Sequence, residues 1–171
     1  MKYKVTFLDY WHIGSGISGG SRVDSTVLKD ENNLPFIPGK TIKGLIREMA
    51  EEVFGEKSEF VIEYFGDEET KIGKAYFSNC YLDENTQKGI IANKLSNNLY
   101  EIIASTKIAE NGIAEDYSLR EIEVTIPLTL YGEIKNIDDK KDEFKKLLKM
   151  VKRMGLNRNR GLGRCEIEEV V

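Results

Sequence analysis

Two amphipathic helices, each set between segments that alternate like β-strands, constrain the fold of this chain more than any other feature. Apolar residues recur at helical spacing from Ile42 to Val53 and again from Phe144 to Met154. The expected elements, in chain order, are a strand at 2–9, a helix at 40–54, strands at 74–82 and 121–131, a helix at 139–154 and a strand at 164–171. This order is the ferredoxin-like βαββαβ motif, so we predict an α+β fold.

The chain length and the spacing of these elements favour a single domain, residues 1–171, with long insertions. Three connections are longer than is usual in a compact domain, at about 10–39, 56–73 and 83–119. Connections of this length are commonly functional or disordered. We therefore expect the function to lie in these insertions.

The predicted topology carries two further expectations. Pro127 falls in the third strand, which the motif makes central, and a central strand excludes proline, so we expect a bulge there. Cys80 and Cys165 are too few for a disulfide framework. Because the second and last strands lie at opposite edges of such a sheet, we expect both thiols to be free and far apart.

The overall charge does not by itself favour nucleic acid. The formal net charge is -4, but affinity depends on local patches rather than on the average. Basic residues are concentrated in two regions, namely Lys40, Lys43 and Arg47, then Arg153, Arg158, Arg160 and Arg164. The composition is therefore neutral evidence on RNA binding.

The chain has no apolar run near the roughly 20 residues that a membrane span needs. It also starts directly in a strand-like pattern, without the apolar region of a signal peptide. We therefore expect a cytoplasmic protein with no membrane partner. His12 is the only histidine, which excludes a histidine-rich metal site.

The start of the first helix is a candidate phosphate contact. Residues 38–41 imitate the end of a P-loop, but position 34 is leucine where that motif needs glycine. Lys40, Lys43 and Arg47 share the helix face opposite the apolar stripe, and Lys40 lies at the N-terminus, which favours anions. We predict contacts to RNA phosphates here; an ordinary solvated face is the alternative.

The segment 155–164, between the second helix and the last strand, is the most specific one. Gly161 and Gly163 allow a close backbone approach, and three arginines supply charge for phosphates: Arg158, Arg160 and Arg164. A basic turn without a ligand is the alternative. The glycines at 14–20 formally match a dinucleotide fingerprint, but no helix opens there. We expect a loop whose backbone N–H groups contact phosphate or which presents a side chain to RNA; a plain flexible loop is the alternative.

These segments resemble the RAMP superfamily of CRISPR proteins. Residues 160–164 resemble its C-terminal glycine-rich loop, residues 34–47 a second hallmark segment, and residues 11–16 the loop before it. Residues 104–108 and 119–124 are similar to the insertion and strand of backbone subunits. The resemblance is closest to the repeated backbone subunit of type III (Csm/Cmr) interference complexes.

That resemblance implies a subunit that stacks on copies of itself and on other CRISPR subunits along a guide RNA. The insertion at 83–119 would form a thumb that wedges between guide and target RNA, with Lys107 as an RNA contact. Asp24 matches the aspartate that cuts the target RNA. A loosely bound magnesium or other divalent cation would be shared with phosphate, because no cluster of ligands is evident.

Three other functions stay open. The chain could be a filament subunit that binds RNA without cutting it, or a small-molecule domain of the same fold. It could also be a metal-independent endonuclease that processes guide RNA, in which His12 would act as acid or base. We assign His12 instead to packing, within the protein or against RNA.

Overall fold

The computed structural model describes residues 1–14, 16, 23–67, 70–106, 108, 112–113 and 118–170. Its centre is a four-stranded antiparallel sheet with the strand order β2-β5-β1-β6. The strands are β1 (Lys2–Phe7), β2 (Tyr76–Phe77), β5 (Thr129–Lys135) and β6 (Cys165–Glu169). This order is that of the ferredoxin-like motif, so the predicted fold is confirmed.

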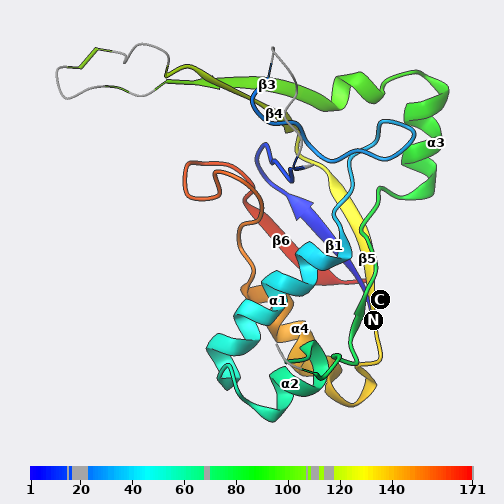
Figure 1. Ribbon diagram of the computed structural model, residues 1–171. Helices are drawn as coiled ribbons and strands as arrows, with labels where there is room; N and C mark the ends of the chain where they lie inside the picture. The colour runs from blue at the N-terminus through cyan, green and yellow to red at the C-terminus, as the bar shows by residue number, and fades with distance from the viewer. Residues whose placement is uncertain are drawn as a thin grey trace.

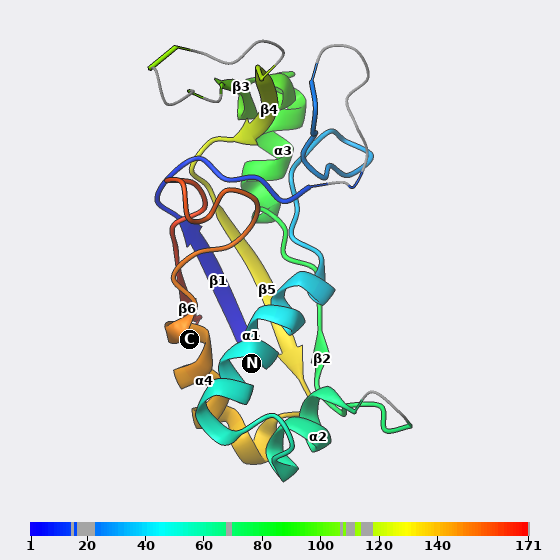
Figure 2. The same ribbon diagram turned by 60° about the vertical axis from the view of Figure 1, so that its left-hand side comes forward.

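Helices α1 (Gly39–Phe54) and α4 (Lys141–Met150) cover one face of the sheet (Figures 1 and 2). Alternate residues of β1 point toward them, so Tyr3 and Val5 are fully buried while Lys2 is exposed. Each large side chain buried in this way contributes roughly 1.5–3 kcal/mol. The opposite face of the sheet has no helix layer in either view.

The predicted strand at 121–131 is wrong as one element. It breaks into β4 (Arg120–Thr125) and β5, which belong to different sheets. Pro127 lies at this break and not in a bulge of a central strand. The backbone groups of Ile126 are used by other segments, since its amide donates to the Leu99 carbonyl and its carbonyl accepts from Trp11 Nε1. Apolar residues alternate in the sequence on both sides of the break, at Ile122, Val124, Leu128 and Leu130, so the pattern does not mark it.

The first helix matches its prediction to within one residue, but the remaining predicted elements are shorter than expected. The predicted strand at 74–82 is observed only as the two-residue strand β2. Just after β2, the Ser78 hydroxyl accepts a hydrogen bond from the Glu133 amide in place of a backbone carbonyl. The second helix is preceded by the 3-10 turn η2 (Asp138–Lys140) and ends at Met150 rather than at 154.

The insertions carry structure of their own. Residues 83–119 hold α3 (Glu84–Ala92), the 3-10 turn η1 (Ser96–Leu99) and β3 (Tyr100–Ser105), which pairs with β4. This β3–β4 hairpin extends away from the main sheet at one end of the molecule (Figure 1). Residues 56–73 hold α2 (Glu59–Phe65), which adds aromatic rings to the core.

Cys80 and Cys165 are both free and buried, as expected. Cys165 is in the edge strand β6, and Cys80 lies beyond the opposite edge strand β2. Burial raises the pKa of the Cys80 thiol to about 11 and that of Cys165 to about 12, so both stay protonated at neutral pH. Of the helices described, none is long and apolar enough to cross a membrane.

Candidate nucleic-acid interface

Asp24 lies beside the β3–β4 hairpin, where its backbone and its side chain both bind Glu121 of β4. The Asp24 amide donates to the Glu121 carbonyl (2.8 Å), and the Glu121 amide donates to Asp24 Oδ2 (2.7 Å). The next residue, Ser25, forms a parallel bridge with Ile122 and accepts from Glu123 N (3.0 Å). The exposed Asp24 carboxylate is therefore held by backbone pairing to the hairpin.

His12 is buried beside Ser25 and connects segments that are far apart in the sequence. Its Nδ1 lies 2.6 Å from the Glu123 carbonyl oxygen, and its Nε2 lies 3.1 Å from the Ser25 hydroxyl oxygen. Since a carbonyl can only accept, Nδ1 carries a proton and donates to it, while Nε2 pairs with the Ser25 hydroxyl. The His12 carbonyl accepts from Leu156 N (2.9 Å). With 1% of the residue exposed, the ring does not reach the surface.

The C-terminal loop, residues 155–164, is fixed against the loop that follows β1. Gly163 N donates to the Tyr10 carbonyl (2.8 Å), and Met154 N donates to the Gly163 carbonyl (2.9 Å). Gly163 has a φ of 69°, a conformation that side chains with a Cβ rarely adopt. The predicted arginine contacts of this loop have exposed side chains: Arg158, Arg160 and Arg164.

We expect Gly163→Ala to lower the free energy of unfolding by roughly 3 kcal/mol or more, because strain and a steric overlap add together. A Cβ at Gly163 would lie 2.0 Å from the Met154 carbonyl oxygen. Gly161→Ala is the matched control, since its φ of 93° is also positive but no atom lies within 4 Å of its Cβ position. That variant should lose only about 1–2 kcal/mol. Equal losses in chemical denaturation would contradict this account of the loop.

The C-terminal loop lies next to the basic face of α1. Arg158 Nη1 is 3.9 Å from Glu48 Oε2, which places the loop beside the middle of this helix. The predicted contacts on α1 follow one another along the same side, with Lys40 exposed and with Lys43 and Arg47 partly exposed. The structure thus brings both predicted basic regions together.

Some of these cations have partners within the chain. Arg47 Nε pairs with Glu51 Oε1 at 2.6 Å, and Arg164 Nε pairs with Asp9 Oδ2 at 3.1 Å. No carboxylate of the described residues lies within ion-pair distance of Arg160. Arg160 is therefore the arginine of this loop that is most available to a phosphate.

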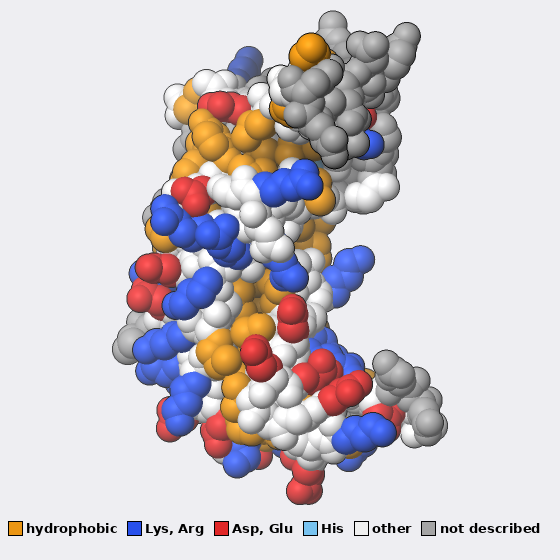
Figure 3. Space-filling view, turned by 90° about the vertical axis from the view of Figure 1, so that its left-hand side faces the viewer, with side chains coloured by type: hydrophobic (Ala, Val, Ile, Leu, Met, Phe, Trp, Pro, Cys, Tyr) orange, Lys and Arg blue, Asp and Glu red, His pale blue; other side chains and the backbone are white. Residues whose placement is uncertain are grey.

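The side that carries the C-terminal loop in Figure 1 is seen face-on in Figure 3. Lys and Arg side chains gather there in a band that runs down one side, starting below the hairpin. This local gathering occurs in spite of the net charge of -4. Lys107, the remaining predicted RNA contact, lies outside the described residues.

The described residues offer no site for a tightly held metal ion. They contain no group of three or more His, Cys, Asp or Glu side chains that could bind one. Asp24 offers a single carboxylate, and its Oδ2 already accepts from the Glu121 amide. This donor set fits a hard divalent cation only if a ligand, such as a phosphate, supplies further oxygens.

Several residues of this site carry no signal in the sequence. Glu123 accepts from Val27 N (3.0 Å) and pairs with Lys29 Nζ (2.7 Å), which fastens the first insertion to the hairpin. Ser25 and Glu121 likewise position their neighbours through bonds across the fold. These contacts join residues almost a hundred positions apart, so no local motif could reveal them.

The comparisons with known proteins concern the family and the fold of the chain. The model of the RAMP superfamily matches residues 4–166. Among solved structures, the chain resembles one in a type III-B Cmr-beta complex bound to cognate target RNA, with a TM-score of 0.76, 12% identity, and coverage of 98% of this chain and 95% of that chain. A chain of the apo type III-B Cmr-beta structure gives a TM-score of 0.74 at 13% identity and the same coverage. No curated protein sequence matches.

Proposed function

Because this chain belongs to the RAMP superfamily, we propose that it is a backbone subunit of a type III CRISPR ribonucleoprotein, which binds guide RNA and cleaves complementary target RNA. The observation that carries the proposal is the junction at His12. There the Asp24 segment, the β3–β4 hairpin and the C-terminal loop each form a hydrogen bond with His12. The similarity to a chain of a complex bound to cognate target RNA supports it.

We call the exposed cations of the C-terminal loop and of α1 the basic band, and this band is the proposed guide-binding surface. Arg158 and Arg160 are exposed in a loop whose glycines permit a close backbone approach, and Lys40 and Lys43 lie on the neighbouring α1. Contacts of these side chains to phosphates are independent of base sequence. Such a surface suits a subunit that must hold guides of any sequence.

The hairpin and Asp24 form the proposed cleavage site. The hairpin would separate guide and target bases, and the Asp24 carboxylate beside it would face the target backbone. Asp24 would act as the base that takes the proton of the attacking 2′-hydroxyl, or would position a cation at the phosphate. A divalent cation shared between Asp24 and the phosphate would supply stabilisation of the developing charge.

Cleavage by His12 without metal is the weaker alternative. The imidazole is 1% exposed, and both of its nitrogens have partners in the protein. To reach a phosphate, it would have to leave the junction that holds Asp24. A subunit that binds without cutting is the second candidate, and it predicts that the wild-type chain cleaves no target RNA.

Assembly tests the proposal without reference to cleavage. A backbone subunit contacts its neighbour head to tail, through a heterologous interface that need not close. We therefore expect oligomers on guide RNA whose size rises with RNA length, measured by analytical ultracentrifugation with a shorter and a longer guide. A closed dimer that forms without RNA at all concentrations would contradict the filament.

A further inference from the structure

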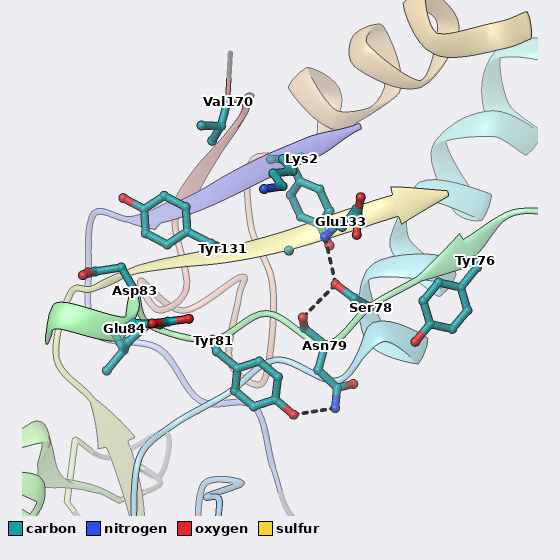
Figure 4. A pocket seen from close by; sticks show the side chains of 13 residues that line it. Lys2, Tyr76, Ser78, Asn79, Tyr81, Asp83, Glu84, Tyr131, Glu133 and Val170 are labelled. Carbon is teal, nitrogen blue, oxygen red and sulfur yellow. Dashed lines mark hydrogen bonds between the residues drawn. The ribbon is translucent and has the colours of Figure 1, made fainter. Parts of the chain in front are cut away.

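The open face of the main sheet carries a groove that the proposed function does not use. Its volume is about 640 Å³, and its walls are formed by β1, β5, the segment after β2 and the start of α3. The rings of Tyr76, Tyr81 and Tyr131 lie along it (Figure 4). They are 56%, 40% and 41% exposed, so an isolated chain leaves much aromatic surface in water.

We propose that this groove binds a short unpaired stretch of RNA by stacking of bases on these tyrosines. This inference extends the proposed function, since it assigns a second RNA contact on the layer opposite the basic band. A four-stranded sheet with aromatic rings on its open face is a known way to bind single-stranded bases. Every base has a π-face, so such stacking tolerates any sequence.

The Tyr81 ring is held in place before a ligand binds, and Tyr131 lies directly opposite it. Tyr81 and Tyr131 form a directly opposed antiparallel pair, with their backbones joined by hydrogen bonds of 3.0 and 2.7 Å, so their side chains share one face. The Tyr81 ring stacks on Phe36 with 5.6 Å between centroids, and its hydroxyl accepts from Asn79 Nδ2 at 3.0 Å. Asn79 Oδ1 in turn accepts from Gly39 N at 2.9 Å. The Tyr81 side chain therefore needs little further ordering when a ligand binds.

Each of the three described carboxylates at the groove has a partner within the chain. Glu133 pairs with Lys135 at 3.4 Å, and Glu84 pairs with Lys88 at 3.6 Å. The third carboxylate, Asp83, caps α3 by accepting from the Thr86 amide at 3.0 Å.

Lys2 is the one cation that lines the groove in the part of the chain that the structure describes. It is exposed at the groove, beside Glu133 in Figure 4. Among the described residues, no carboxylate lies within ion-pair distance of it. Its ammonium group is therefore available to a phosphate, while the rings accept the bases.

The test uses the full chain and a six-nucleotide uridine RNA that contains 4-thiouridine. Ultraviolet cross-linking followed by peptide mass spectrometry should find nucleotide on Tyr81 or Tyr131. Affinity for the same RNA, measured by fluorescence anisotropy, should fall roughly 5- to 150-fold in Tyr131→Leu, the loss expected for one stacked base. Tyr131→Phe keeps the ring and should bind like the wild type. Phe54→Leu, which removes an exposed ring at the end of α1, is the control and should also bind normally.

The outcomes separate this inference from the proposed function. If Tyr131→Leu and Tyr81→Leu fold and bind like the wild type while Arg158→Ala/Arg160→Ala binds weakly, the groove is no RNA site and the proposed function stands. Loss of self-association in the tyrosine variants, with no nucleotide cross-linked to the groove, would make it a protein contact and overturn the inference. If the wild type binds no RNA, both proposals fail.

Discussion

Asp24→Ala is expected to lower the rate of target cleavage by roughly 10²- to 10⁴-fold, the contribution of a positioned acid–base group. Guide binding should change little, because the basic band lies on α1 and the C-terminal loop. Folding should also be almost intact, since the side chain is exposed and gives up one hydrogen bond, to the Glu121 amide. The measurement is cleavage of a complementary RNA by the assembled guide complex in magnesium.

Asp24→Asn provides the matched control. It keeps an oxygen that can accept from Glu121 N, so the loop should stay in place while the negative charge is lost. A large loss of cleavage in both variants assigns the effect to the charge, and metal chelation should have the same effect on the wild type. Cleavage at the wild-type rate in Asp24→Ala would remove the carboxylate from the mechanism.

Arg158→Ala/Arg160→Ala is expected to weaken guide RNA binding by roughly tenfold or more, because two charge-assisted contacts to phosphates are lost. The loss should be the same for RNAs of different sequence. The dependence of log affinity on log salt should become shallower by about 1.4, given about 0.7 for each single-stranded phosphate released. Filter binding over a range of salt concentrations measures both quantities.

Lys146→Ala/Lys149→Ala is the control for this variant. It removes the same number of charges from the exposed side of α4, away from the C-terminal loop. It should leave the slope close to that of the wild type. Identical slopes for the wild type and both variants would show that the loop is not the binding surface.

The sequence predicts the main sheet and its helices well because their signals are local. The spacing of Ile42, Ile46 and Ala50 marks the buried side of α1 without knowledge of its partner. The break near Pro127 could not be foreseen in this way. Residues on both sides of it alternate, and a pattern of period two does not tell which sheet each half joins.

The sequence suggested residues of the candidate site, but it did not predict the hydrogen bonds between them. Asp24 and the loop arginines could be chosen from their chemistry and from a family resemblance. The bond between Asp24 and Glu121 crosses 97 positions of sequence, so it follows from the folded arrangement alone. The buried position of His12 is a result of the same kind, because a single histidine has no periodic neighbours that reveal its surroundings.

The length distribution of RNA that copurifies with this chain from its native cells tests the central claim most directly. A backbone subunit of a guide complex should carry RNA of uniform length, since each copy covers a fixed number of nucleotides of a processed guide. Sequencing of that RNA should find a shared segment joined to variable ones. Absence of RNA, or a broad mixture of cellular RNA fragments, would contradict the account.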